Sequence, residues 1–174
     1  MNTVDRMQAV RADITEFEID AVVNAANRSL LGGGGVDGAI HRKAGPGLLE
    51  ECRTLIGCET GEAKITGAYL LPARFVIHTV GPIYNGKSDD AHKLENCYRN
   101  SLQLAADGRF NQIAFPAISC GIYGYPIQEA ASIAVDAAFS FLDKHEFPSS
   151  VLFALFSQDH HDIYLQKLKR MGLR

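Results

Sequence analysis

The sequence lacks the features that mark several special classes of protein. No apolar run approaches the ~18 residues that a transmembrane helix requires, and residues 1–7 contain no basic segment followed by an apolar core, as a secretory signal would. The four cysteines form no C-x-x-C pair, and no run of Lys or Arg stands out in a chain of net charge −3. These absences predict a cytoplasmic protein with reduced thiols and no membrane segment. They also argue against strong nucleic-acid binding.

What is present is typical of a globular α/β protein. The chain has 174 residues, of which 47% are hydrophobic and 21% charged, so a single domain over residues 1–174 is expected. Strand-like apolar runs alternate with segments of helical periodicity, which favours a mostly parallel sheet covered on both sides by helices. The predicted strands are 7–11, 21–26, 63–71, 74–80, 113–116 and 151–156, and the predicted helices are 36–44, 47–55, 91–106, 126–142 and 162–171. In such sheets, ligands bind beyond the carboxyl ends of the strands.

The most informative segment follows the second predicted strand. Asn24 and Asn27 bracket the end of that strand, and a run of four glycines, residues 32–35, then opens a helix. Glycine loses more freedom on folding than any other residue, so this run is useful where backbone N–H groups must approach an anion closely. Asp37 lies in the first helical turn, where the helix dipole favours a carboxylate, and His41 shares its face four residues on.

Two interpretations of this segment remain open from spacing alone. An Asp at a helix start with an i,i+4 partner, and Asn residues in a turn, are ordinary structural features. Alternatively, Asp37 orients or deprotonates a water molecule with His41 in support, while the amides of Asn24 and Asn27 bind ribose hydroxyls. The glycine run favours this second interpretation.

A second loop, residues 116–126, joins a buried predicted strand to a helix. Its two glycines are interleaved with Ser119 and Tyr123, a composition that suits a loop holding phosphate through backbone N–H groups. Cys120 is a poor candidate for a nucleophile, because no base lies beside it in the sequence. Asp13, after the first predicted strand, is either a turn cap or an acceptor for the amine of a nucleobase.

Residues 81–88 formally match the pattern G-x-x-x-x-G-K-[ST] of a phosphate-binding loop. However, Pro82 removes a backbone donor, Asp89 and Asp90 would repel phosphates, and no strand ends in an Asp that could hold Mg²⁺. A surface loop whose acidic residues cap the next helix is therefore favoured.

The histidines outside the glycine-rich segment give no metal signature. His160 and His161 have no partner at ligand spacing, and His78, inside an apolar strand, is interpreted as a core or rim histidine.

Four segments together closely resemble the macrodomain family, and best its MacroD-like branch. They are Asp13-Ile14-Thr15, Asn24-Ala25-Ala26-Asn27, Gly32 to His41, and Ser119 to Pro126. The resemblance covers nearly the whole chain in order, and the final strand ending in Leu155-Phe156-Ser157 fits it as well. One departure is Ala12, where many relatives have Gly; it leaves Asp13 in place.

The resemblance implies a three-layer α/β/α fold that binds ADP-ribose in a cleft at the rim of the sheet, without a cofactor or a metal. Asp13, helped by the Ile14 amide, would bind the adenine amine, and Phe156 would lie against the ring. Asn27 would hold the distal ribose, with Asn24 beside it, and Asp37 would be the main catalytic residue, supported by His41. The diphosphate would be gripped by Gly33, Gly34, Gly35 and Val36 and by Ser119, Cys120, Gly121, Ile122 and Tyr123, the last also closing over the distal ribose.

The implied reactions are hydrolyses beside the distal ribose. They are deacetylation of O-acetyl-ADP-ribose and removal of mono-ADP-ribose from acidic side chains, so the expected partners are ADP-ribose and its acetyl or protein-linked esters. Two alternatives belong to other classes: a module that binds ADP-ribose without turnover, and a P-loop nucleotide-binding protein that uses residues 81–88. An acid in the helix after the glycine run favours the hydrolase, and Asp37 supplies it.

Overall fold

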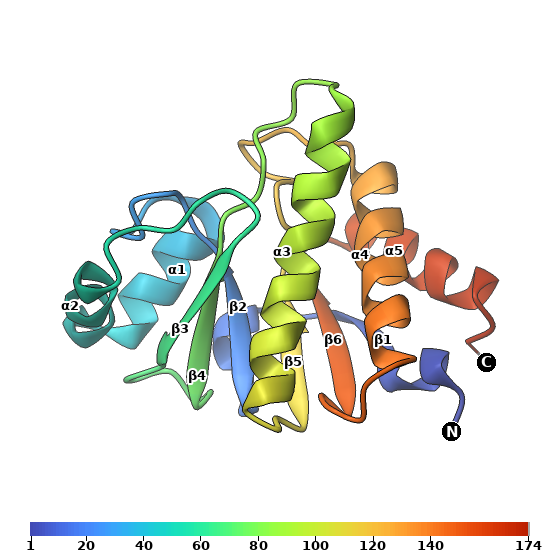
Figure 1. Ribbon diagram of the computed structural model, residues 1–174, viewed down its shortest axis with the longest axis horizontal. Coiled ribbons are helices and arrows are strands. Elements are labelled where there is room, and N and C mark those ends of the chain that lie inside the picture. The colour runs from blue at the N-terminus through green and yellow to red at the C-terminus, as the bar shows by residue number, and fades with distance from the viewer. Residues whose placement is uncertain (174) are drawn as a thin grey trace.

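The computed structural model describes residues 1–173, and within them six strands form one sheet (Figure 1). The strands stand in the order β1-β6-β5-β2-β4-β3, with β3 antiparallel to β4 and all other neighbours parallel. They are β1 (Met7–Arg11), β2 (Ala21–Ala25), β3 (Ala63–Gly67), β4 (Phe75–Thr79), β5 (Gln112–Phe115) and β6 (Ser150–Leu155). The carboxyl ends of the five parallel strands therefore meet at one edge of the sheet.

Helices cover both faces of the sheet, as the alternating pattern predicts. One face packs against α1 (Gly35–Ala44) and α2 (Pro46–Thr54), and the other against α3 (Ser88–Asp107), α4 (Ile127–Leu142) and α5 (Gln158–Arg170). Short 3-10 helices, η1 (Thr3–Arg6) and η2 (Ile14–Glu16), flank β1. The arrangement is the expected three-layer α/β/α fold. A single domain over residues 1–174 stays a prediction.

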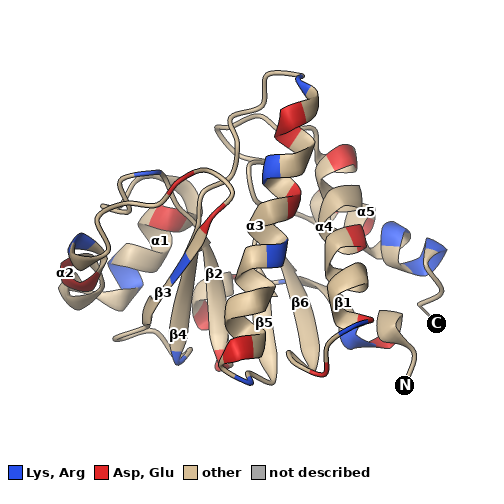
Figure 2. Cartoon of the chain, in the orientation of Figure 1, with Lys and Arg blue, Asp and Glu red and all other residues tan. Residues whose placement is uncertain are grey.

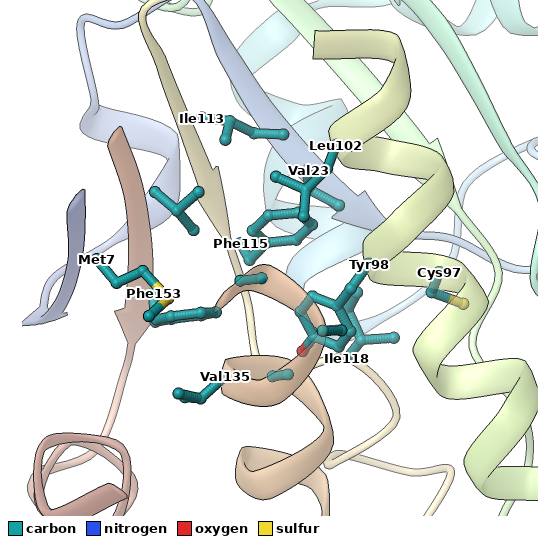
Figure 3. Packing of buried hydrophobic residues seen from close by; sticks show 14 of the residues in the cluster. Met7, Val23, Cys97, Tyr98, Leu102, Ile113, Phe115, Ile118, Val135 and Phe153 are labelled. Atoms are coloured by element: carbon teal, nitrogen blue, oxygen red, sulfur yellow. The ribbon is translucent and has the colours of Figure 1, made fainter. Parts of the chain in front are cut away.

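The larger core lies between the sheet and α3, α4 and α5 (Figure 3). Phe115 of β5 packs between Tyr98 of α3 and Phe153 of β6, with ring centroids 4.9 and 6.3 Å away. The alanine-rich face predicted for the fourth helix is buried, and its small side chains let α4 lie close to α3 and α5. The smaller core, under α1 and α2, is the one beside the glycine-rich segment.

Side chains along β2 alternate between the two faces of the sheet. Ala21 and Val23 face the larger core, while Val22 faces the smaller one. Asn24 continues the series of Val22 and so points toward α1. The register of the parallel pair sets Asn24 directly opposite His78 of β4.

Three element bounds differ most from the sequence prediction. The strand predicted over 63–71 ends at Gly67, because the chain turns there: Leu71 N–H donates to Ala68 O, and Tyr69 has a φ of +55°. The last helix, predicted from 162, begins at Gln158, because the Ser157 side chain accepts from His160 N–H and caps it. The helix predicted from 91 begins at Ser88.

Figure 2 shows that Lys and Arg positions alternate with Asp and Glu positions along α3. Within residues 1–173, none of the helices has the length and hydropathy that crossing a bilayer would require.

Candidate active site

Three loops leave neighbouring strands at the carboxyl edge of the sheet. The glycine-run loop (residues 32–35) follows β2, residues 81–85 follow β4, and the Ser119 loop (residues 119–123) follows β5. The second and third loops are joined by a hydrogen bond from Tyr84 N–H to Tyr123 O, 2.9 Å long. The sheet order thus gathers segments that lie far apart in the sequence.

Asp37 is the buried carboxylate of this edge. Only 4% of the residue is exposed, and its Oδ1 accepts a 2.8 Å hydrogen bond from Asn24 Nδ2. His41 Nε2 approaches the same oxygen at 3.4 Å. Burial raises the pKa of Asp37, and the Asn24 hydrogen bond and the nearby His41 oppose that rise. The predicted pairing of Asp37 with His41 on one helix face is therefore present.

The second carboxylate oxygen of Asp37 points toward the glycine-run loop. A Cβ placed on Gly33 would lie 3.0 Å from Asp37 Oδ2 and 3.3 Å from Asn27 Nδ2. Asn27 holds the loop in turn, since its Nδ2 donates to Gly32 O at 2.9 Å and its Oδ1 accepts from Ser29 Oγ at 2.7 Å. A side chain at position 33 would therefore displace Asp37 Oδ2 or the Asn27 amide.

The remaining glycines of the run leave the start of α1 open. Nothing lies within 4 Å of a Cβ built on Gly34 or Gly35, and Gly34, the N-cap, forms no side-chain cap bond. Gly35 has a φ of +58°, which favours glycine. The first N–H groups of a helix have no intrahelical partner, so this open start, which also carries the half-buried Val36, can receive an anion.

His78 is the residue that sequence reasoning left outside the site. It is fully buried, and its Nδ1 lies 3.2 Å from Asn24 Nδ2. Burial and the nearby His41 lower its pKa to about 3. The interpretation as a core histidine is confirmed, but its contact with Asn24 depends on strand order and register, which the sequence does not state.

The Ser119 loop presents backbone more than side chains. Ser119 has a φ of +65°, and its buried Oγ has no hydrogen-bond partner among the described residues. A Cβ on Gly121 would meet nothing within 4 Å, and the Ile122 side chain is 94% exposed. Burial raises the pKa of Cys120 to about 12, which disfavours the thiolate and agrees with its rejection as a nucleophile.

Asp13 and Phe156 come together at the far end of the same edge. Arg11 and Leu155 pair in register, and Ala12 N–H donates to Leu155 O at 3.1 Å. Phe156 is 85% exposed, so its aromatic ring is accessible to a ligand. Asp13 Oδ1 accepts from Thr15 N–H and Thr15 Oγ1–H at 2.9 and 2.7 Å. These two bonds lower its pKa. The cap interpretation of Asp13 holds, and the buried Ile14 follows it.

The segment from Gly81 to Ser88 was predicted to be a surface loop, but its first two residues are buried. Gly81 and Pro82 are buried, and a Cβ on Gly81 would collide with Ser119 Oγ. The N-cap of α3 is Lys87, which makes no side-chain cap bond, and Asp90 instead accepts from Asn85 N–H at 2.9 Å. The segment supports the Ser119 loop. Over residues 1–173, no group of three or more His, Cys, Asp or Glu side chains is arranged to hold a metal ion.

Comparison with known proteins agrees with this fold. A "Macro domain-containing protein" from Methanosarcina mazei is 56% identical over 158 residues, covering 90% of this chain and 84% of the relative. The Xenopus laevis protein named "ADP-ribose glycohydrolase MACROD2" is 53% identical over 94% of this chain, which spans 40% of that protein. A mutant of the Oceanobacillus iheyensis macrodomain with ADPR superposes with a TM-score of 0.91 at 46% identity, covering 95% of this chain and 92% of that one. The family model described as Macro domain matches residues 23–134, and this chain belongs to the macro domain family.

Proposed function

We propose that the protein is a hydrolase that binds ADP-ribose and cleaves ester bonds at its distal ribose. The names of the relatives support this proposal, since MACROD2 is called an ADP-ribose glycohydrolase and a macrodomain of the same fold has been solved with ADPR. The observation that carries it is Asp37, a buried carboxylate whose Oδ2 faces the open glycine-run loop.

A buried carboxylate at the edge of an open cradle suits general base chemistry. Burial raises the pKa of Asp37, and a raised pKa makes a carboxylate a stronger base toward water. Asp37 takes a proton from water as the water attacks the carbonyl carbon of the ester. The ribose oxygen departs from that carbon and receives the proton. Much of the effect comes from positioning, because the ligand's own diphosphate helps to hold the attacking water.

The binding roles follow the resemblance and fit the observed placement of each residue. The glycine-run loop with Val36, and the Ser119 loop from Ser119 through Cys120, Gly121 and Ile122 to Tyr123, hold the diphosphate with backbone N–H groups. Asn27, with Asn24 beside it, holds the distal ribose, and His41 supports Asp37. At the other end, Asp13 and the Ile14 amide bind the adenine amine, and Phe156 covers the ring.

The substrates are O-acetyl-ADP-ribose and proteins that carry mono-ADP-ribose on acidic side chains, and the reaction uses no metal. We place the protein in the cytoplasm, which fits four unpaired cysteines.

The decisive experiment compares the wild type with Asp37→Asn and Asp37→Ala in the presence of EDTA. Each protein is incubated with O-acetyl-ADP-ribose and with a Glu-linked mono-ADP-ribosylated protein, and products are followed by mass spectrometry. Loss of the base is expected to lower kcat by at least about 100-fold, while calorimetry gives an ADP-ribose Kd within about threefold of wild type.

A matched control is Asp89→Asn, which neutralises another Asp in the first turn of a helix, on α3. Asp89 is exposed and pairs with Lys93, so wild-type turnover is expected. Intact ADP-ribose binding by a wild type that hydrolyses neither substrate would replace the hydrolase with a binding module. Nucleotide binding that requires Mg²⁺ and is lost in Lys87→Ala would instead favour the P-loop alternative.

A further inference from the structure

A chain of hydrogen bonds runs across the sheet beneath the proposed base. Asn24 Nδ2 contacts Asp37 Oδ1 at 2.8 Å and His78 Nδ1 at 3.2 Å. On the other side of the imidazole, His78 Nε2 lies 2.9 Å from Thr66 Oγ1, which donates to Gly67 O at 2.9 Å. Three strands, β2, β4 and β3, therefore contribute side chains to one connected network.

The direction of each hydrogen bond follows from the groups involved. An ionised carboxylate only accepts, so one amide hydrogen of Asn24 goes to Asp37, and the second is left for His78 Nδ1. A neutral imidazole that accepts on Nδ1 carries its hydrogen on Nε2, where Thr66 Oγ1 receives it. The hydroxyl hydrogen of Thr66 is already given to Gly67 O. In this arrangement both Asn24 amide hydrogens, the His78 Nε2 hydrogen and the Thr66 hydroxyl hydrogen each meet an acceptor.

Burial keeps this imidazole neutral. The pKa of His78 is lowered to about 3 by burial and by His41. The ionisable groups around it are Asp37 and His41 from α1 and, from α2, Cys52, whose Sγ is 3.7 Å from Nε2, with Glu51 bonded to Gly67 N–H. Burial raises the pKa of Cys52 to about 11, so the thiol stays protonated. His78 therefore has one protonation state over the range in which enzymes are assayed.

The network also distinguishes the two oxygens of Asp37. Oδ1 accepts a hydrogen bond from the Asn24 amide and lies 3.4 Å from His41 Nε2. Oδ2 has no hydrogen-bond partner among the contacts of the described residues, and it is the oxygen nearest to the position of a Cβ on Gly33. One oxygen is thus held by the protein while the other is left for water.

We propose that His78 is a positioning residue: by accepting one amide hydrogen of Asn24, it aims the other at Asp37 Oδ1 and so fixes Asp37 with Oδ2 toward the substrate. This proposal rests on the proposed function, because it treats Asp37 as the base. His78 itself touches no substrate. Its effect on the reaction passes through Asn24.

The test uses two substitutions at His78 and a control on the same strand. His78→Leu removes the acceptor while keeping a similar volume, whereas His78→Asn returns an acceptor oxygen close to the place of Nδ1. Thr79→Val is the matched control, because Thr79 is also fully buried in β4 and its hydroxyl bonds to Glu62 O on the other side of the strand. Thr66→Val is a milder change, because it keeps the His78 imidazole and removes only the hydroxyl to which Nε2–H donates.

His78→Leu is expected to lower kcat about tenfold, the effect of one hydrogen bond to a charged group, with the Kd for ADP-ribose within about threefold of wild type. The acidic limb of the kcat profile should move to higher pH, because the Asp37 carboxylate loses an aligned donor. His78→Asn should recover part of both changes, and Thr66→Val should show a smaller loss. Thr79→Val should change neither.

A titration separates this proposal from the proposed function. The Asp37 carboxyl carbon is followed by NMR against pH in the substrate-free protein, which requires no turnover. A midpoint that rises in His78→Leu and returns toward wild type in His78→Asn supports the positioning role even if the wild type hydrolyses nothing. A folded His78→Leu protein with an unmoved midpoint overturns it. So does a shift of equal size in Thr79→Val, since the cause would then be general loosening of the strand.

Discussion

The glycine-run loop and the Ser119 loop line the same edge of the sheet, yet they work by different means. Around the glycine run, side chains interlock: Asn24, Asn27 and Asp37 bond to one another or to loop backbone. The Ser119 loop offers an open Gly121 and the outward side chain of Ile122. The glycine-run loop therefore positions the proposed catalytic side chains, whereas the Ser119 loop exposes mainly backbone groups. A side chain added at Gly33, beside Asp37 Oδ2, should act on kcat, and one added at Gly121 should act on binding.

The most direct test of this difference introduces the same side chain into both loops. In Gly33→Val, the added Cβ would lie 3.0 Å from Asp37 Oδ2, so kcat should fall by at least about 100-fold through misplacement of the base. In Gly121→Val, the fold has room, so kcat should persist while blocked phosphate contacts weaken ADP-ribose binding about tenfold.

Steady-state kinetics and calorimetry on the two variants give these numbers, with circular dichroism to confirm folding. Equal losses of kcat in both variants would remove the distinction between the loops.

A smaller effect is expected on stability. Burial raises the pKa of Asp37 above its usual value of 3.8, so the fold disfavours the ionised form. Stability is then fully present below the unfolded pKa and falls as pH rises through the folded pKa. Asp37→Asn, which cannot ionise, should be more stable than wild type by about 1 kcal/mol at pH 7.

Urea denaturation measures this gain at several pH values. The gain should shrink toward zero as the pH is lowered to the usual carboxyl range. A difference that is independent of pH would mean that charge burial is not its cause.

The smallest effect is expected at Cys120, in the Ser119 loop. Its Sγ donates to Ile118 O at 3.5 Å, and burial raises its pKa to about 12. Cys120→Ala should leave kcat within about twofold of wild type, because a protonated thiol is not a nucleophile. Inactivation of the wild type by a thiol-alkylating reagent, with Cys120→Ala equally inactive, would contradict this expectation.

Much of the fold was predictable from the sequence because its signals are local. The apolar run of β2, the glycines before α1 and the alanine face of α4 each act within one element. The element bounds that were wrong depend on single turns and caps, such as the Ser157 cap that starts α5 before residue 162.

The pairing of Asp37 with His41 was also predictable, since helical spacing sets it. The contact between Asn24 and His78 was not, because it needs the order and register of two strands that lie more than fifty residues apart. The burial of Gly81 against Ser119 needed the same information. Residues 81–88 therefore looked like a separate motif in the sequence, although their first part supports the neighbouring loop.

The division of the interior into two cores has a consequence for inactivation by heat. Asp37 belongs to α1, which packs on the smaller core, whereas most large aromatic side chains lie on the other face. Regions with fewer buried contacts open at lower free energy than the molecule as a whole. The layer that carries the proposed base is thus the one able to separate from the sheet first. Activity would then be lost while the other half of the molecule is still folded, and substrate that holds α1 to the sheet would delay that loss.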